Sequence, residues 1–239
     1  MSLPTINAPI YELTLPIKNE KIKYRPFNIK EQKILMIALE SDDIIFINDN
    51  VKEVIKTCCQ NKIDVDALAT ADVEYLFLNL RARSIGEVIY PKYRCKNVVE
   101  GEVCDTDMET KINVLDVVVD LNGYTDVIQL DSNIGLKMKH PNFDLFKNFS
   151  SERDILDMTS EAIAHCVDYV FDNDRLYYSD EFTKTELIDW IDELNNDQFR
   201  KIEEHFLHLP KLRKDIDLTC SKCGYEHKIV LEGLQNFLA

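Results

Sequence analysis

The cysteine pair Cys220 and Cys223 constrains the fold of this chain more than any other feature of its sequence. The segment reads Cys-Ser-Lys-Cys-Gly and lies between two strand-like runs. A Cys-x2-Cys-Gly sequence between strands is typical of a zinc knuckle, in which two thiolates converge on one ion and glycine permits the positive backbone angle of the tight turn. A knuckle supplies two ligands, whereas structural zinc takes four.

Cys95 and Cys104 are the natural source of the other two ligands, because they also lie between strand-like segments, with eight residues between them. We therefore expect a structural zinc site in a β ribbon whose halves are far apart in the sequence, with the ligands Cys95, Cys104, Cys220 and Cys223. Four protein ligands leave no coordination position for water, so the ion would stabilise structure and not catalyse. His227 could replace one thiolate if Cys95 or Cys104 points away.

Two other interpretations of the knuckle cysteines stay open at this stage. They could be remnants of a lost site, or a redox pair, although a redox Cys-x2-Cys normally starts a helix in a thioredoxin-like βαβ unit and no such unit is visible. Cys166 falls on the apolar face of a predicted helix with Ala162 and Tyr169, and we expect it to be a small buried hydrophobe. Cys58 and Cys59 lie near the end of another predicted helix.

Hydrophobic periodicity predicts a chain of mixed secondary structure. Alternation predicts an N-terminal hairpin of residues 10–15 and 21–25. Six helices are predicted: from residue 30, over 51–60, over 71–84 with Thr70 as N-cap, from 150 or 151 through Tyr169, over 183–194 and over 197–209. Further strands are predicted over residues 87–94, 108–121, 126–130, 134–140, 212–218 and 225–231.

These segments predict an α+β fold, a mainly helical body with an N-terminal β-hairpin and a discontinuous, zinc-ribbon-like β lobe. We expect the hairpin and its helices in residues 1–86 and a helical segment in residues 141–210. The β lobe would combine residues 87–140 with residues 211–239, which brings the two cysteine pairs into one lobe.

The charge of the chain narrows the classes of partner. Its 239 residues include 43 acidic and 28 basic side chains, which give a formal net charge of −15 and a pI near 4.8. This balance argues against a generic nucleic-acid binder, which needs a basic face to release counterions from phosphate. The sequence shows no secretory signal and no run near the roughly 18 apolar residues of a membrane span, so we expect a cytosolic protein without a membrane partner.

Catalytic motifs are weak. The sequence has no glycine-rich phosphate loop and no Gly-x-Ser-x-Gly elbow. His205 and His208 share a helix without an HExxH pattern, and the segment from Asp172 departs from a calcium loop at Tyr177 and Thr183, where glycine and glutamate are required. We expect that the chain is not an enzyme, with a hydrolase built from scattered carboxylates as the alternative.

A docking surface is a second candidate site. Aromatic and apolar residues concentrate around an acidic loop: Tyr169, Phe171, Leu176, Tyr177, Tyr178, Phe182 and Trp190, with Asp172, Asp174, Asp180 and Glu181. Aromatic residues anchor protein interfaces, and an acidic rim attracts a basic partner. The alternative is that about half of these side chains pack the C-terminal helices.

Three stretches near the N-terminus resemble one family of viral proteins. They are residues 9–16 (PIYELTLP), 21–27 (KIKYRPF) and 30–40 (KEQKILMIALE). In this order they resemble the baseplate hub proteins of T-even-like contractile-tailed bacteriophages, and the chain length and the late Cys-x2-Cys-Gly are similar too. The resemblance implies a structural component or assembly factor of the tail baseplate hub, with other hub proteins as partners, in the host cytoplasm during assembly or in the virion tail. It implies no catalytic residues.

The main alternative is a zinc-ribbon adaptor that binds nucleic acid or the transcription or replication machinery. Five basic side chains surround the predicted knuckles and would form a local basic patch: Lys92, Arg94, Lys96, Lys222 and Lys228. Binding that weakens steeply with salt would favour this alternative, because phosphate contacts release counterions.

Overall fold

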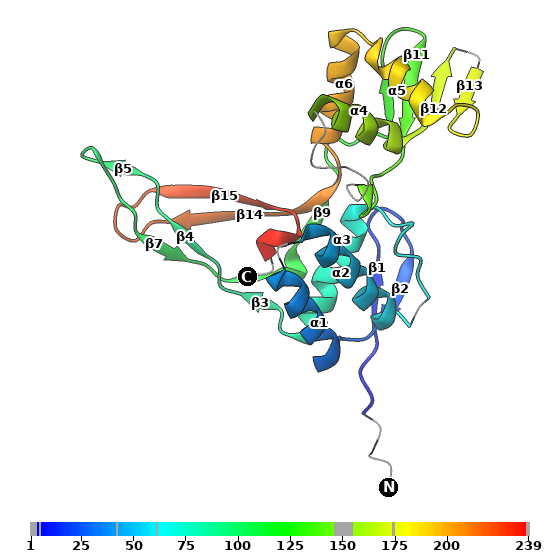
Figure 1. Ribbon diagram of the computed structural model, residues 1–239. Helices are drawn as coiled ribbons and strands as arrows, with labels where there is room; N and C mark the ends of the chain where they lie inside the picture. The colour runs from blue at the N-terminus through cyan, green and yellow to red at the C-terminus, as the bar shows by residue number, and fades with distance from the viewer. Residues whose placement is uncertain are drawn as a thin grey trace. The chain divides into compact units, whose positions relative to one another are not determined.

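The chain folds into two compact units (Figure 1). The computed structural model describes residues 4, 6–41, 43–60, 62–145, 155–173 and 175–237, with only the backbone of 155–158. Unit 1 consists of Met1–Val65, Ala71–Asp120 and Lys211–Ala239, and unit 2 of Asp66–Thr70 and Leu121–Pro210. Helices and antiparallel sheets occur in both units, so the predicted mixed α and β composition is confirmed.

A hairpin and three helices form the first part of unit 1. The strands β1 (Tyr11–Thr14) and β2 (Lys21–Tyr24) pair antiparallel, which confirms the predicted N-terminal hairpin. The helices that follow are α1 (Ile29–Glu40), α2 (Ile44–Cys58) and α3 (Thr70–Ser84). α3 is buried along most of its length, and Leu15 of the hairpin is fully buried with it in the core of unit 1.

The helix α2 begins seven residues earlier than the hydrophobic pattern predicts, at Ile44 instead of residue 51. Asp43 caps it, because its Oδ1 accepts hydrogen bonds from the amides of Ile45 and Phe46 at 2.9 and 3.2 Å. The first turn of α2 is exposed although its residues are apolar. The apolar residues of this turn therefore show no helical period that would reveal the start of the helix. The cap at Asp43 determines where the helix starts.

A β-arm, residues 88–113 together with residues 211–232, completes unit 1. Three short ladders follow one another along its first hairpin: β3 (Val88–Ile89) with β8 (Ile112–Asn113), β4 (Lys92–Arg94) with β7 (Asp107–Glu109), and β5 (Val98–Val99) with β6 (Glu102–Val103). The second hairpin pairs β14 (Lys211–Thr219) with β15 (Glu226–Glu232), and β9 (Val118–Asp120) adds to β14. The two hairpins lie side by side (Figure 1).

The predicted strand over residues 108–121 is interrupted. A 3-10 turn, Val114–Asp116, separates β8 from β9. Asn113 stabilises this turn, because its Oδ1 accepts a hydrogen bond from the amide of Leu115 at 3.1 Å. The interruption lets the chain leave the first hairpin and pair β9 with the second one.

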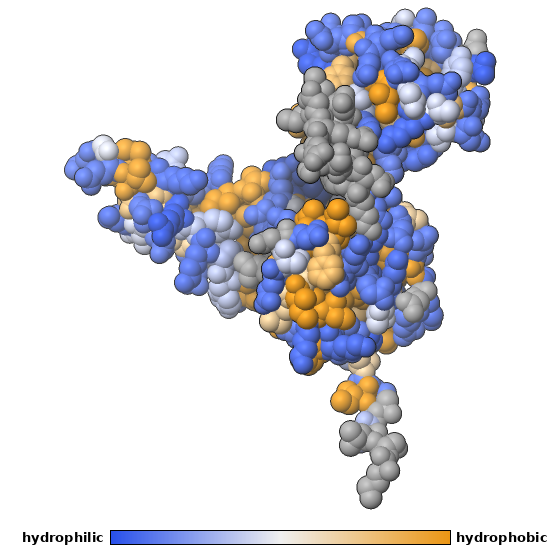
Figure 2. All heavy atoms as spheres, viewed as in Figure 1, coloured by the Kyte–Doolittle hydropathy of each residue, from blue (hydrophilic) through white to orange (hydrophobic). Residues whose placement is uncertain are grey.

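The tip of the β-arm exposes apolar residues. Val98, Val99 and Val103 are 58%, 45% and 59% exposed, and Figure 2 shows hydrophobic atoms gathered around the end of the arm where β5 lies. Glu100 and Gly101 form the connecting turn with positive φ of 52° and 90°.

In its described residues, unit 2 packs three helices with a four-stranded antiparallel sheet of order β10-β11-β12-β13. The strands are β10 (Val127–Gln129), β11 (Ile134–Met138), β12 (Val167–Asp172) and β13 (Arg175–Tyr178). The helices are α4 (Ile155–Cys166), α5 (Lys184–Asp192) and α6 (Asn196–Leu207). Leu136, Ile163, Ile191 and Ile202 are at most 1% exposed and form the centre of the core of this unit.

The prediction of a helix through Tyr169 is wrong beyond Cys166, and the segment 141–210 is not wholly helical. α4 ends at Cys166, and the β-branched and aromatic run that follows it forms β12. Leu136 of β11 pairs with Val170, so β10 and β11, which we expected in the zinc-ribbon-like lobe, belong to the sheet of unit 2. The helical spacing of Tyr169 with Cys166 is a coincidence that long-range pairing overrides.

Candidate metal centre

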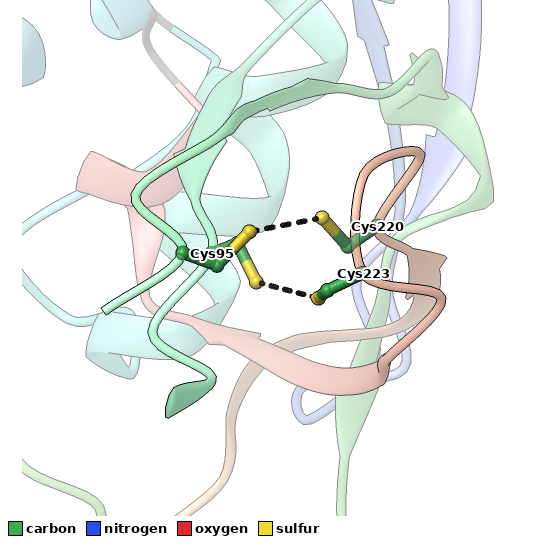
Figure 3. A group of neighbouring side chains, drawn as sticks. Cys95, Cys220 and Cys223 are labelled. Carbon is green, nitrogen blue, oxygen red and sulfur yellow. Dashed lines mark hydrogen bonds between the residues drawn. The ribbon is translucent and has the colours of Figure 1, made fainter. Parts of the chain in front are cut away.

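Four cysteines from two distant segments meet in the β-arm. Cys95 follows β4, Cys104 follows β6, and Cys220 and Cys223 lie in the turn between β14 and β15. Their four Sγ atoms lie within 4.8 Å of one another. Cys95 and Cys223 are 3.6 Å apart between Sγ atoms, and Cys104 and Cys220 are 3.8 Å apart; Figure 3 shows Cys95 facing Cys220 and Cys223 across the gap between the two hairpins.

The two cysteine pairs have the same backbone geometry. In the Cys220 turn, Gly224 has φ +69°, its amide donates to the carbonyl of Cys220, and the amide of Cys220 donates to the carbonyl of Tyr225. In the Cys95 segment, Asp105 has φ +48° and its amide donates to the carbonyl of Cys95. The amide of Cys95 donates to the carbonyl of Thr106. Both pairs therefore have the backbone geometry expected of a knuckle, and Asp105 occupies the position in the first pair that Gly224 has in the second.

The equivalence explains the wide spacing between Cys95 and Cys104. The tip hairpin of β5 and β6 is inserted inside an otherwise ordinary knuckle, and a hydrogen bond of 2.8 Å from the amide of Cys104 to the carbonyl of Asn97 closes the base of the insertion. Asp105 is a sequence signal for this turn, because aspartate tolerates positive φ better than most residues. Spacing alone could not show it.

Polar groups surround the four thiols. The amide nitrogen Nδ2 of Asn97 donates to Sγ of Cys223 over 3.6 Å, and Oγ1 of Thr106 lies 3.2 Å from Sγ of Cys104. His227 Nε2 lies 3.2 Å from Sγ of Cys95, so His227 contacts a thiol from outside the group of four and does not replace one of its members. Asn97 and Thr106 were not identified by sequence reasoning.

The backbone favours thiolates in the second knuckle. The pKa of Cys220 is lowered to about 6 by the amides of Cys223 and Lys222, which donate to its sulfur, and the amide of Tyr225 lowers the pKa of Cys223. Burial raises the pKa of Cys95 to about 12. A bound cation would favour the thiolate of Cys95 as well, because metal ligation deprotonates thiols.

The geometry of the cluster fits a tetrahedral thiolate site. Sulfurs about 2.3 Å from one zinc ion lie roughly 3.8 Å apart, close to the two shortest separations here. All seven cysteines are free thiols, so no disulfide competes for these four. Asn97 donates a hydrogen bond to one of the sulfurs and Thr106 contacts another, which is the kind of second layer that orients metal ligands.

Within the described residues, the remaining cysteines and the histidine pair belong to no such cluster. Cys166 is 1% exposed in the core of unit 2, which confirms its interpretation as a buried hydrophobe, and Cys58 and Cys59 are buried too. His205 Nδ1 donates to the carbonyl of Thr125, whereas His208 Nδ1 donates to the carbonyl of Glu204. Each histidine therefore has its own backbone partner; His205 lies in α6, and His208 is the residue that caps its C-terminal end.

The aromatic and acidic segment of the sequence divides between two faces of unit 2. Tyr177, Phe182 and Trp190 line a cavity with Asp172. Phe171 lies on the other face of β12, against Gly135, where its ring and the carbonyl of Ile128 fill the space a side chain would need. The remaining members lie outside the cavity lining: Tyr169, Leu176, Tyr178, Asp180 and Glu181. Asp174 lies outside the described residues.

The basic side chains near the knuckles alternate with acidic ones. Lys92 pairs in register with Glu109, and Lys228 with Asp217. Arg94 lies 3.4 Å from a carboxylate oxygen of Asp105 and 3.5 Å from one of Asp107. The patch therefore does not present an uninterrupted positive surface.

The fold and the cysteine cluster define an acidic, two-unit protein of mixed α and β structure, with a four-thiol centre in a split β structure. The chain belongs to the family described as T4 bacteriophage base plate protein, which matches residues 8–239. This confirms the resemblance at the level of the baseplate family. The match covers both units and all four clustered cysteines.

Other comparisons add no relative. No curated protein and no solved structure matches the chain. Within the described residues, none of the helices has both the length and the apolar character needed to cross a membrane.

Proposed function

We propose that this chain is a structural component of the phage tail baseplate hub, or an assembly factor for it, that acts through protein contacts and not by catalysis. In this proposal Cys95, Cys104, Cys220 and Cys223 hold one structural zinc ion. The cluster of four sulfurs within 4.8 Å carries the zinc assignment, and membership of the baseplate family supports the role in the tail. The bound ion would supply a rigid cross-link between the two hairpins of the β-arm.

The small core of the β-arm supports a stabilising role for the ion. Its cluster of buried residues consists of Met108 and three of the cysteines, with Tyr93 and Leu218 packed at its edge. The ladders of the first hairpin are only two or three residues long. Scaffolds with so small a core commonly rely on a further cross-link such as a metal ion.

The surface of the arm supports binding to protein over binding to nucleic acid. Exposed apolar residues gather at the tip, around Val98 and Val103, as at protein interaction sites. The basic residues of the arm alternate with acidic partners, which weakens the attraction of phosphate. Cys104 lies at the base of the tip. An ion bound to it would therefore hold the tip in one orientation.

The zinc assignment can be tested by elemental analysis of the purified protein. We expect about one zinc per chain in the wild type and none in Cys220→Ser, which also melts at a lower temperature and is less soluble. The control Cys166→Ala removes a buried thiol elsewhere, and we expect it to lower the melting temperature without loss of zinc. Iron in place of zinc would reassign the ion, since a tetrahedral four-sulfur site suits both. A wild-type protein that contains no metal, and whose melting temperature does not change when a chelator is added, would contradict the proposal.

The role in the tail can be tested in infected cells. Antibody against the chain should detect it in baseplate assembly intermediates. Its presence in finished tails would make it a component, and its loss from them would make it an assembly factor. Absence from intermediates and tails, together with salt-sensitive DNA binding, would replace the proposal with the zinc-ribbon adaptor.

A further inference from the structure

Unit 2 contains an open cavity of about 290 Å³ between its sheet and α5. Its walls are apolar or aromatic except at two carboxylates. Trp190, Tyr177 and Phe182 supply the aromatic walls, and Asp172 and Glu186 supply the carboxylates. Aromatic walls with a few convergent charges are typical of a recognition pocket.

The register of the sheet builds this pocket. Val170 of β12 lies directly opposite Tyr177 of β13, and Asp172 lies opposite Ile134 of β11. Because side chains alternate along a strand, Val170 and Asp172 share one face of the sheet. β13 is the last strand of the sheet, so the pocket opens beside a sheet edge.

Charge identifies the occupant. Unit 2 holds 20 acidic and 8 basic side chains, a formal charge of −12, whereas unit 1 holds 23 and 20. Most of the net charge of the chain is therefore in the unit that carries the pocket. This charge attracts a cationic partner and opposes docking of a second copy of the same unit.

Arg175, beside the pocket, contacts one aromatic ring of the lining and one carboxylate outside it. The Cζ atom of Arg175 lies 4.4 Å from the centre of the Tyr177 ring, and its guanidinium is 3.6 Å from a carboxylate oxygen of Glu181. Arg175 is not in the pocket lining, and its contact with Tyr177 shows that this ring accepts a cation at its face. Glu186 uses Oε2 for the capping box with Thr183, which fixes its position at the start of α5.

We propose that this pocket binds a lysine or arginine side chain that a partner protein presents on an apolar segment. The aliphatic stem would pack against Trp190 and Phe182, and the charged head would lie between the ring of Tyr177 and the carboxylates of Asp172 and Glu186. This inference deepens the proposed function. Only one part of it rests on that function, namely that the partner is another baseplate protein.

Trp190 allows a direct test, because it is the only tryptophan in the chain. The full-length protein is titrated with acetyl-Leu-Arg-Leu-amide, and Trp190 fluorescence is followed. We expect saturable binding that weakens with salt and that is roughly threefold to tenfold weaker for Asp172→Asn. The matched control Asp180→Asn removes the same charge from an exposed position outside the lining and should leave the affinity unchanged.

Two outcomes of the titration would overturn the inference. One is equal binding of acetyl-Leu-Gln-Leu-amide, because the pocket would then recognise only apolar groups. The other is equal loss of affinity in the Asp172→Asn and Asp180→Asn proteins, which would show a diffuse electrostatic effect. Self-association of the wild type that Asp172→Asn abolishes would identify a second copy as occupant and also overturn it.

A second experiment separates this inference from the proposed function. A photo-crosslinking amino acid replaces Tyr177 in phage-infected cells, and the joined peptide is sequenced. We expect a baseplate protein joined next to a lysine or arginine. If the wild-type protein is found in baseplates and the Asp172→Asn protein is incorporated equally well, only the inference about the pocket is contradicted. Wild-type protein absent from baseplates would contradict the proposed function, while the peptide titration would still decide the pocket.

Discussion

At the scale of single residues, the two knuckles differ at one position that should control their stability. Gly224 and Asp105 both have positive φ, of 69° and 48°, and both donate to the carbonyl of the first cysteine of their pair. Positive φ is accessible to glycine without steric cost and to aspartate at a smaller cost than to β-branched residues. The backbone conformation, not side-chain contact, therefore determines which residues these positions accept.

We predict that Gly224→Ala destabilises unit 1 by about 1 kcal/mol, because alanine is strained at positive φ. No atom lies within 4 Å of a Cβ built at Gly224, so the cost comes from the backbone alone. Urea unfolding of the zinc-loaded protein measures it. Asp105→Gly is the matched change in the other knuckle and should be neutral or stabilising. A larger loss in Asp105→Gly than in Gly224→Ala would contradict the equivalence of the two knuckles.

At the scale of secondary structure elements, long-range partners decide positions that local patterns leave open. The N-terminal hairpin is attached to α3 by Asp72, whose fully buried carboxylate accepts hydrogen bonds of 2.9 Å from the amides of Ile17 and Lys18. The turn between β1 and β2 is thus held by a residue 54 or 55 positions away. The strand alternation that predicts the hairpin contains no sign of this anchor.

We predict that Asp72→Ala destabilises unit 1 by about 2–4 kcal/mol, because two amides of the β1–β2 turn lose their acceptor. Equilibrium unfolding in urea measures the change. The control is Glu20→Ala in the same turn, which removes a half-exposed ion pair with Lys18 and should cost at most about 1 kcal/mol. Equal costs for the two variants would show that Asp72 does not anchor the hairpin.

Glu31, in the first turn of α1, makes a contribution to folding stability that depends on pH. Burial of Glu31 acts to raise its pKa, but two hydrogen bonds from Arg25 and one from the amide of Asn28 outweigh it and lower the pKa. The stabilisation is therefore complete above the unfolded pKa of about 4.3 and is lost as pH falls through the lower folded value.

We predict that Glu31→Gln removes about 1 kcal/mol of stability at pH 7 and that the difference from wild type shrinks as the pH approaches 3. Unfolding free energies across this pH range measure it. The exposed Glu40→Gln serves as control and should track the wild type. A difference for Glu31→Gln that stays constant from pH 7 to pH 3 would show that the ion pair is not its source.

At the scale of the whole molecule, the metal centre and the charged pocket belong to different units. The cysteine cluster lies in unit 1, whereas Trp190 and most of the net negative charge lie in unit 2. Each unit has its own core, so loss of the cross-link in one should leave the packing of the other intact.

We predict that a zinc chelator loosens the β-arm and leaves unit 2 unchanged. Amide hydrogen exchange should accelerate within residues 92–109 and 211–232, because the ladders there are short and their core is small. Trp190 fluorescence should stay constant through the same titration. A simultaneous shift of Trp190 emission would mean that the units do not unfold independently. Unchanged exchange in the arm would mean that the ion does not hold it.

The sequence by itself determined the cysteine set, the N-terminal hairpin and the positions of several helices. These depend on local chemistry: cysteine spacing with glycine at a turn, strand alternation, and caps such as Asn28, Thr183 and Asn195. Only the tertiary structure decided that residues after Cys166 form a strand, because the residues of their partner β11 lie 29 to 38 positions away along the chain.

Tertiary structure also decided what the cysteines and the aromatic segment do. The 4.8 Å cluster exists because β4, β7 and β14 bring together residues more than 110 positions apart, a placement that no local pattern encodes. Strand register likewise placed Asp172 and Tyr177 at the pocket on one face of the sheet and Phe171 over Gly135 on the other, since alternate side chains of a strand point to opposite faces. Local interactions fix which elements form, and long-range pairing fixes which residues share a site.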